Sequence, residues 1–203
     1  AVLVIDREDD ALPLAEALLS GGVKVMELTL RTPAAVPAFK RIKREVVEMT
    51  VGIGTVLTRD QVSLCVDEGA DFAVSPGLNP DTLSYALERG LPFAPGVMTP
   101  SDIEAGLAQG CRWLKYFPAE SAGGVKHLGD MLAPYQHLGL SFIPLGGLTV
   151  DNMQNYFALP SVVAIGGSWI AKREAILAGD WKGIGARARD AVERAALCLK
   201  NRK

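Results

Sequence analysis

The nine residues Arg112–Glu120 read RWLKYFPAE and predict a short strand that runs into a proline. Side chains on a strand alternate between two faces, so Trp113, Lys115 and Phe117 share one face. Lys115 therefore lies between two aromatic side chains, on a strand with no polar face. Strands that are apolar on both faces are typical of parallel sheets covered by helices.

Lys115 admits two interpretations. In the first, the side-chain stem packs against apolar neighbours while the ammonium group reaches water, because lysine is seldom fully buried. In the second, the amine is desolvated, which lowers its pKa from the usual value of about 10.4. A neutral amine can attack a ketone and form a Schiff base. The side chains that share its face decide between the two.

The same pattern of a short apolar run followed by a helix recurs along the whole chain. The predicted strands are residues 2–5, 23–30, 50–53, 71–74, 92–94, 112–117, 141–144 and 162–165. The predicted helices start at Asp9 or Asp10 as N-cap and then cover residues 33–46, 58–68, 80–89, 100–108, a part of 124–136, 150–158 and 181–200.

Eight strand–helix units within 203 residues favour a closed (β/α)8 barrel over an open doubly wound sheet. No stretch is long enough to be a linker, so we expect a single α/β barrel domain, residues 1–203. In such a barrel the active site collects at the carboxyl ends of the strands. We therefore look for catalytic and binding residues at the end of each strand and in the loop that follows it.

Composition excludes several classes of partner. The chain is 49% hydrophobic and 22% charged, with a formal net charge of -2. That balance is ordinary for a globular protein and gives no reason to expect nucleic acid or an anionic membrane. No apolar run approaches the roughly 20 residues of a spanning helix, and we expect no leader peptide.

Cysteine and histidine usage argues against a metal site. Cys65, Cys111 and Cys198 are odd in number and widely spaced, which predicts reduced thiols and a cytoplasmic protein. His127 and His137 have no cysteine or carboxylate nearby at ligand spacing. We therefore expect neither a metal, a cofactor nor a histidine-dependent mechanism.

The second predicted strand carries two charges on one face. Alternation turns Glu27 and Arg31 toward the barrel interior, where an unpaired charge is costly. One interpretation is a buried structural ion pair between them. The other is functional: a carboxylate base beside the Lys115 amine, with the guanidinium holding an acid substrate.

The third predicted strand ends in Gly52-Ile53-Gly54-Thr55. Counting by alternation, we expect Thr55 to face inward together with Val51 and Ile53. The motif has no third glycine in register, so it does not predict a dinucleotide site.

Two glycine clusters follow the last two predicted strands, at Gly146-Gly147 and at Gly166-Gly167-Ser168. In a barrel these two loops commonly bind phosphate, because glycine leaves backbone N–H groups unobstructed. Ser168 adds a hydroxyl donor. The sequence therefore predicts a phosphorylated small molecule as ligand.

Five segments together carry a resemblance that spans nearly the whole chain in order. They are residues 27–32 (ELTLRT), 51–57 (VGIGTVL), 75–77 (SPG), 115–120 (KYFPAE) and 166–169 (GGSW). The chain resembles the bacterial 2-keto-3-deoxy-6-phosphogluconate (KDPG) aldolases, some of which also have 4-hydroxy-2-oxoglutarate (KHG) aldolase activity. The resemblance implies a homotrimeric (β/α)8 barrel and a metal-free class I aldolase.

The resemblance also implies roles for individual residues. Lys115 corresponds to the Schiff-base lysine and Glu27 to the general acid and base. The remaining matched positions imply substrate contacts: Arg31 and Thr55 at the carboxylate and substrate, Pro76 and Phe117 as pocket walls, and Gly146, Gly147, Gly167 and Ser168 as a phosphate cradle.

The chain departs from the family at two places. Leu145 stands where the family usually has threonine, and alternation points it into the barrel near Lys115. A helix that usually precedes the first strand is absent from this sequence.

Several alternatives stay open at this point. They are the same imine chemistry on the galactonate epimer or another 2-keto acid, a non-catalytic barrel used as an assembly unit, and a phosphosugar epimerase. We also expect the Lys115 pKa to be lowered on balance, with a Glu27–Arg31 interaction weakening the opposing effect of Glu27.

Overall fold

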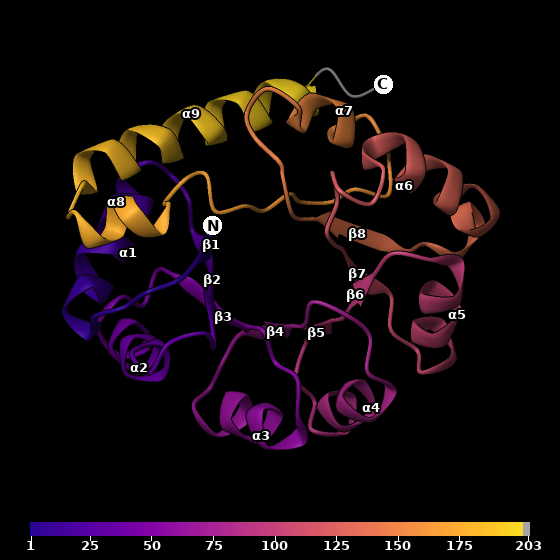
Figure 1. Cartoon of the computed structure of the whole chain (residues 1–203), viewed down its shortest axis with the longest axis horizontal. Helices are drawn as coiled ribbons and strands as arrows, with labels where there is room; N and C mark the ends of the chain where they lie inside the picture. The colour runs from indigo at the N-terminus through magenta and orange to yellow at the C-terminus, as the bar shows by residue number, and fades with distance from the viewer. Residues whose placement is uncertain (201–203) are drawn as a thin grey trace.

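Short parallel strands form a ring, and the helices lie outside it (Figure 1). The computed structural model describes residues 1–200, so the last three residues of the predicted domain lie outside the described part. The strands are β1 Val2–Leu3, β2 Val25–Thr29, β3 Thr50–Gly54, β4 Phe72–Val74, β5 Phe93–Ala94, β6 Gly96–Val97, β7 Trp113–Tyr116 and β8 Ser141–Pro144. The helices are α1 Ala11–Ser20, α2 Ala35–Glu45, α3 Arg59–Asp67, α4 Pro80–Glu88, α5 Pro100–Ala108, α6 Gly124–Leu132, α7 Met153–Phe157, α8 Arg173–Leu177 and α9 Trp181–Lys200, with 3-10 turns η1 Glu8–Asp10 and η2 Ala133–Leu138.

The regular ladder of strand hydrogen bonds is interrupted at three places around the ring: between β5 and β6, after β8, and before β1. β1 to β5 pair in chain order as one sheet, and β6 to β8 as another. Pro95 separates β5 from β6 and has no N–H to donate, but its carbonyl accepts the Lys115 N–H at 2.9 Å. On the far side, the Val2 N–H donates to the Gly167 carbonyl at 3.1 Å. The chain is thus a (β/α)8 barrel, as the sequence predicted.

The predicted last strand, residues 162–165, is not a regular strand. It makes only isolated parallel bridges to the β8 side, Phe142 with Val162 and Leu145 with Gly166. The bridged positions are therefore three residues apart on one side and four apart on the other, so one strand carries an extra residue, as in a β-bulge. Pro144 lies between the bridges and cannot donate to the ladder, which accounts for the break.

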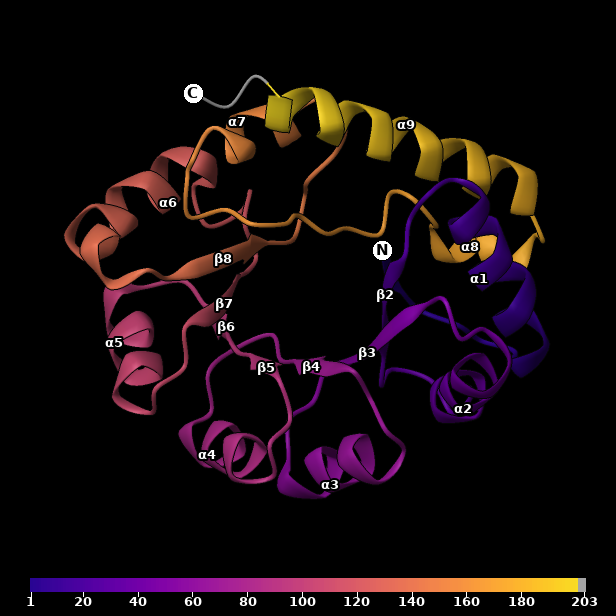
Figure 2. The same ribbon diagram turned by 180° about the vertical axis from the view of Figure 1, so that it is seen from behind.

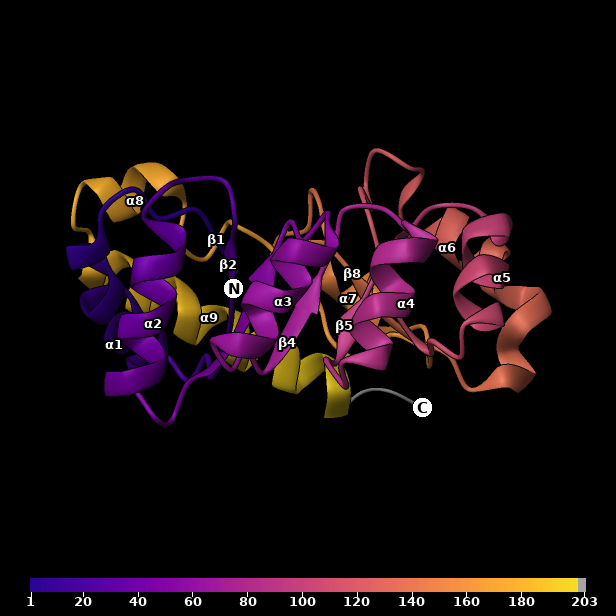
Figure 3. The same cartoon turned by 90° about the horizontal axis from the view of Figure 1, so that it is seen from below.

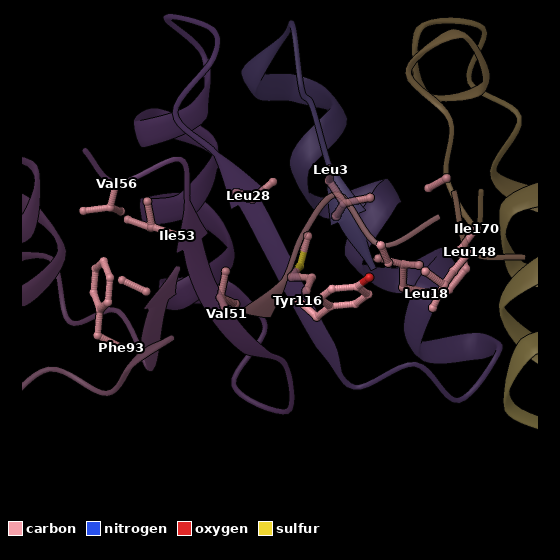
Figure 4. Packing of buried hydrophobic residues seen from close by; sticks show 14 of the residues in the cluster. Leu3, Leu18, Leu28, Val51, Ile53, Val56, Phe93, Tyr116, Leu148 and Ile170 are labelled. Carbon is pink, nitrogen blue, oxygen red and sulfur yellow. The ribbon is translucent and has the colours of Figure 1, made fainter. Parts of the chain in front are cut away.

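The outward faces of the strands pack against the helical layer. Figure 4 shows Leu28 of β2 and Val51 and Ile53 of β3 among the buried side chains. All three are at most 1% exposed. The prediction that Val51 and Ile53 face the barrel interior is therefore wrong, because the parallel register pairs Glu27 with Gly52 and places the two glycines inward.

Helix starts follow local chemistry in some places only. The Thr58 side chain caps α3 by accepting the Gln61 N–H, as predicted. The predicted cap by Asp9 or Asp10 is wrong, because the Asp10 carboxylate instead accepts two hydrogen bonds from Arg7 at 2.9 Å. The sequence pattern also missed α8 entirely.

The long helix α9 runs along the outside of the barrel, over α1 and α8, in both face views (Figures 1 and 2). Gly21 at the end of α1 permits this approach. A Cβ at Gly21 would lie 2.4 Å from the Ala188 Cβ and 2.6 Å from the Gly185 carbonyl oxygen. The φ of Gly21 is -90°, which alanine also adopts, so the obstacle to a larger residue is contact with α9 alone.

We expect Gly21→Ala to lower the free energy of unfolding by about 1–3 kcal/mol, because the added methyl group overpacks the α1–α9 contact. Urea denaturation measures this. The matched control is Gly77→Ala, where an added Cβ meets nothing within 4 Å. Equal free energies of unfolding for the two variants would contradict the inference that the α1–α9 contact requires glycine at position 21.

Candidate active site

All ten residues that the sequence singled out line one cavity of about 520 Å³ at the carboxyl ends of the strands. These residues come from loops and strands far apart in the chain: Glu27, Arg31, Thr55, Pro76, Lys115, Phe117, Gly146, Gly147, Gly167 and Ser168. A volume of this size suits a small-molecule ligand.

The centre of the cavity is an ion pair between strands on opposite sides of the ring. The Lys115 Nζ of β7 lies 3.4 Å from the Glu27 Oε1 of β2. The two side chains are only 7% and 8% exposed. Lys115 is therefore the desolvated amine of the second interpretation, and not a lysine that reaches bulk water.

Burial lowers the pKa of Lys115 from its ordinary value, and this is the dominant effect. The Glu27 carboxylate opposes it by charge and by hydrogen bonding, and the Arg31 guanidinium lowers the pKa further. The predicted direction is confirmed. The predicted reason is wrong in part, because Glu27 stays beside Lys115 and burial outweighs it.

The alternative of a structural Glu27–Arg31 ion pair does not describe this site. Within residues 1–200 the salt-bridge partner of Glu27 is Lys115. The Arg31 Nε donates instead to the Thr29 hydroxyl at 3.1 Å, and the Thr29 hydroxyl donates to the Leu3 carbonyl at 2.9 Å. This chain of hydrogen bonds holds the guanidinium at the cavity and leaves it free of a carboxylate partner among the described residues.

The two glycines of β3 make room for neighbouring side chains. A Cβ at Gly54 would lie 1.9 Å from the Glu27 Oε1, and one at Gly52 would lie 2.2 Å from the Phe72 ring. Any side chain at Gly54 would therefore displace the carboxylate. The Gly52-Ile53-Gly54 motif is explained by space inside the barrel, consistent with the prediction that it is not a dinucleotide site.

Thr55 reaches the cavity by a change in backbone conformation. Alternation along β3 would turn it outward with Val51 and Ile53, but its φ is +63°, in the left-handed region. This conformation is unusual for a β-branched residue and stores strain. It turns the Thr55 side chain into the cavity lining.

Two loops at the mouth are joined by backbone hydrogen bonds. The Ala119 N–H donates to the Leu145 carbonyl at 2.8 Å, and the Glu120 N–H donates to the Gly146 carbonyl at 3.0 Å. Gly146 and Gly147 adopt φ values of +100° and +79°, which favour glycine. The loop after β7 and the loop after β8 thus form one unit.

A hydrogen bond from α7 holds the loop after β7 in place. The Tyr156 hydroxyl of α7 donates to the Glu120 carboxylate, and burial raises the pKa of that hydroxyl well above its usual value. The Glu120 side chain also packs over Gly147, where an added Cβ would lie 2.7 Å from the Glu120 Cβ. The glycine loop is therefore positioned by a helix that lies outside the site.

Leu145 points into the barrel, as predicted. It is 5% exposed and lines the site cavity together with Lys115. It also borders a larger apolar space of about 880 Å³ toward the amino ends of the strands. Its aliphatic side chain presents an apolar surface to the inner end of the cavity, which Lys115 also lines.

Sequence reasoning missed other lining residues, notably Thr149, Trp169 and Lys172. The sequence predicted no role for Trp169, whose ring fills the space that a side chain at Gly167 would take. Lys172 lies just before α8, a helix that no periodic pattern revealed. A lysine only four residues after Ser168 was the available signal.

The structure also bears on metal ions and membranes. Within residues 1–200, no group of three or more histidine, cysteine, aspartate or glutamate side chains is arranged to hold a metal ion. Among the same residues no helix combines the length and apolarity needed to cross a bilayer.

Comparisons with known proteins agree with one another. The family model "KDPG and KHG aldolase" matches residues 1–187. The KHG/KDPG aldolase of Escherichia coli K12 is 44% identical over 97% of this chain and 91% of its own length. The 2-dehydro-3-deoxy-phosphogluconate aldolase of Dickeya dadantii is 44% identical over 94% of this chain and 89% of its own.

A solved structure gives the same result in three dimensions. The KDPG aldolase of Legionella pneumophila, with pyruvate captured as a covalent carbinolamine, superposes with a TM-score of 0.90. It is 38% identical, and the match covers 94% of this chain and 91% of that one.

The electrostatics of the cavity generate a prediction for the amine. Because Arg31 lowers the Lys115 pKa, Arg31→Met should raise it; because Glu27 raises the pKa, Glu27→Gln should lower it further. NMR titration of the lysine side chains measures both midpoints. At pH values between the Lys115 midpoint and that of surface lysines, Lys115 is neutral while the surface lysines are charged.

The control for this titration is Arg44→Met, which removes an arginine whose side chain is 71% exposed. It should leave the Lys115 midpoint unchanged. A parent midpoint at or above that of the exposed lysines would contradict the lowered pKa.

Proposed function

This chain belongs to the KDPG and KHG aldolase family and is a class I, Schiff-base aldolase, and we propose that Lys115 is the amine that forms the imine. The proposed reaction is cleavage of 2-keto-3-deoxy-6-phosphogluconate to pyruvate and glyceraldehyde 3-phosphate. The observation that carries the assignment is the buried Lys115 amine, 3.4 Å from the Glu27 carboxylate.

The first half of the reaction builds the electron sink. The neutral Lys115 Nζ attacks the C2 ketone and gives a carbinolamine. Glu27 moves a proton from the attacking nitrogen to the carbinolamine oxygen and then delivers a second proton, taken up from solvent, so that the hydroxyl leaves as water. The product is a protonated imine, and its positive charge is placed to accept electrons from the neighbouring carbon–carbon bond.

The second half breaks that bond. Glu27 takes the proton of the C4 hydroxyl, the C3–C4 electron pair moves toward the iminium, and glyceraldehyde 3-phosphate leaves. The enamine that remains takes a proton at C3, and water hydrolyses the resulting imine to free pyruvate. Glu27 lies within reach of the same nitrogen throughout, so a single carboxylate serves both halves.

The other cavity residues are proposed to bind different groups of the substrate. We assign the substrate carboxylate to Arg31, whose guanidinium is held by Thr29, with Thr55 as a further polar contact. Pro76 and Phe117 form walls, and the Phe117 ring centre lies 5.3 Å from the Lys115 Nζ. Gly146, Gly147, Gly167 and Ser168 are the proposed phosphate site.

A second substrate is 4-hydroxy-2-oxoglutarate, which the same imine would cleave to pyruvate and glyoxylate. Its support is the name of the Escherichia coli relative, which pairs both activities. Rates on the two substrates and on the galactonate epimer rank the specificities. The family assignment argues against the assembly-unit and epimerase alternatives.

We further propose that the chain is a single barrel domain acting as a cytoplasmic homotrimer. The trimer rests on the family resemblance. The cytoplasmic location rests on the metabolic role of the family and on thiols that are unpaired, at Cys65, Cys111 and Cys198. Analytical ultracentrifugation measures the oligomeric state.

Borohydride reduction with pyruvate tests the role of Lys115. We expect the parent to gain one covalent adduct, located on Lys115 by peptide mass spectrometry, and Lys115→Met to gain none. Lys126→Met is the matched control, because that ammonium is exposed and paired with Asp130 at 2.8 Å. An undiminished adduct in Lys115→Met would assign the imine to another lysine.

A separate prediction concerns Glu27. Glu27→Gln should lower kcat about 10²–10⁴-fold, because the amide cannot shuttle protons. Each variant is measured at its own optimal pH, so that the shifted Lys115 pKa does not enter the comparison. Glu48→Gln, an exposed position, is the control. A Glu27→Gln enzyme with more than a tenth of the parent kcat would remove Glu27 from the mechanism.

A further inference from the structure

Lys172 is a cavity-lining cation that the proposed mechanism does not use. It lies between the glycine–serine loop and α8, and lines the same cavity as Gly147 and Ser168. The edge-on view of Figure 3 places α8 toward the same face of the barrel as the loop between β7 and α6. Lys172 is exposed and follows Ser168 by four residues, so it lies toward the mouth of the cavity on the segment that carries part of the proposed phosphate site.

The Lys172 ammonium has no anionic partner in the part of the chain that the structure describes. Its neighbour Arg173 binds Asp6, with the Arg173 Nε at 2.8 Å from an Asp6 carboxylate oxygen. That acid is therefore occupied by a different cation. A lysine without a carboxylate, placed at a cavity, is free to meet an anion from solution.

The charges of the cavity lining point the same way. Three cations line the cavity, Arg31, Lys115 and Lys172, against a single carboxylate, Glu27. Glu27 is paired with Lys115, so two cations remain without a carboxylate partner among residues 1–200. The whole chain has a net charge of -2, so this excess of positive charge is local. Two separate cations suit a ligand with an anionic group at each end.

The two free cations also lie on different structural elements. Arg31 follows β2 and is tied to Thr29. Lys172 lies next to α8, beyond Ser168. A ligand bound to Arg31 by its carboxylate would extend past Lys115 toward the glycine loops and Lys172.

We propose that Lys172 determines specificity for a phosphorylated substrate, by binding the phosphate group together with the glycine loops and the Ser168 hydroxyl. This inference rests on the proposed function, since it assumes that the reacting ketone lies at Lys115. Lysine binds phosphate as a mobile point charge, and such a charged contact strengthens binding.

The test compares two substrates that differ only in phosphate, 2-keto-3-deoxy-6-phosphogluconate and 2-keto-3-deoxygluconate. We expect Lys172→Met, which keeps most of the stem and removes the charge, to lower kcat/KM for the phosphorylated substrate about tenfold, mainly through KM. The value for the unphosphorylated substrate should change less than twofold. Lys172→Arg should retain most of the preference, and Lys126→Met should behave as the parent.

Two further measurements separate this proposal from the proposed function. Inorganic phosphate binding, measured by calorimetry, should weaken in Lys172→Met and not in Lys126→Met, whether or not the protein turns over substrate. Pyruvate trapping by borohydride should be equal in the parent and Lys172→Met. Absence of an adduct in the parent would reject the aldolase mechanism at Lys115, but it would not by itself decide whether Lys172 binds phosphate.

The remaining outcomes decide against Lys172. An equal fall in kcat/KM for both substrates would show a structural role, and unchanged values for both would show no role. Unchanged phosphate affinity in Lys172→Met would equally overturn the proposal.

Discussion

The contact between the Lys115 amine and the Glu27 carboxylate, inside a ring of apolar strands, is the constraint on which the rest of the structure depends. The two residues are 88 positions apart and lie on strands that do not pair with each other. Closure of the barrel brings them within 3.4 Å and leaves the two side chains only 7% and 8% exposed. Burial disfavours the charged amine, and the carboxylate beside it limits that effect.

The cavity is organised along its depth by solvent. Leu145 and the Phe117 ring keep the surroundings of the amine apolar, whereas Arg31 and Lys172 stand where side chains are exposed. Charge interactions are stronger where water is excluded. Bond-making groups therefore belong at the inner end, and groups that recognise the anionic ends of a ligand belong nearer the mouth.

Local rules predicted much of this arrangement, and long-range geometry supplied the rest. Alternation along β2 and β7 placed Glu27 and Lys115 correctly, because both strands keep a regular pleat. It failed at Thr55, whose left-handed φ breaks the alternation, and at residues 162–165, where Pro144 interrupts the ladder. The partner of Glu27 depended on closure of the ring, which no local pattern encodes. Lys172 was missed because its position follows from α8, a helix too short for a periodic signal.

The absence of a side chain at Gly54 restricts how positions 27 and 54 can change during sequence divergence. The space that a Cβ would need is already filled by the Glu27 carboxylate, so residue 54 cannot be enlarged while that carboxylate keeps its position. A lineage that enlarged position 54 would first have to shorten or withdraw the acid on the adjacent strand, passing through an intermediate with an impaired proton shuttle. Positions 27 and 54 therefore form an epistatic pair, because the effect of enlarging residue 54 depends on the side chain at position 27.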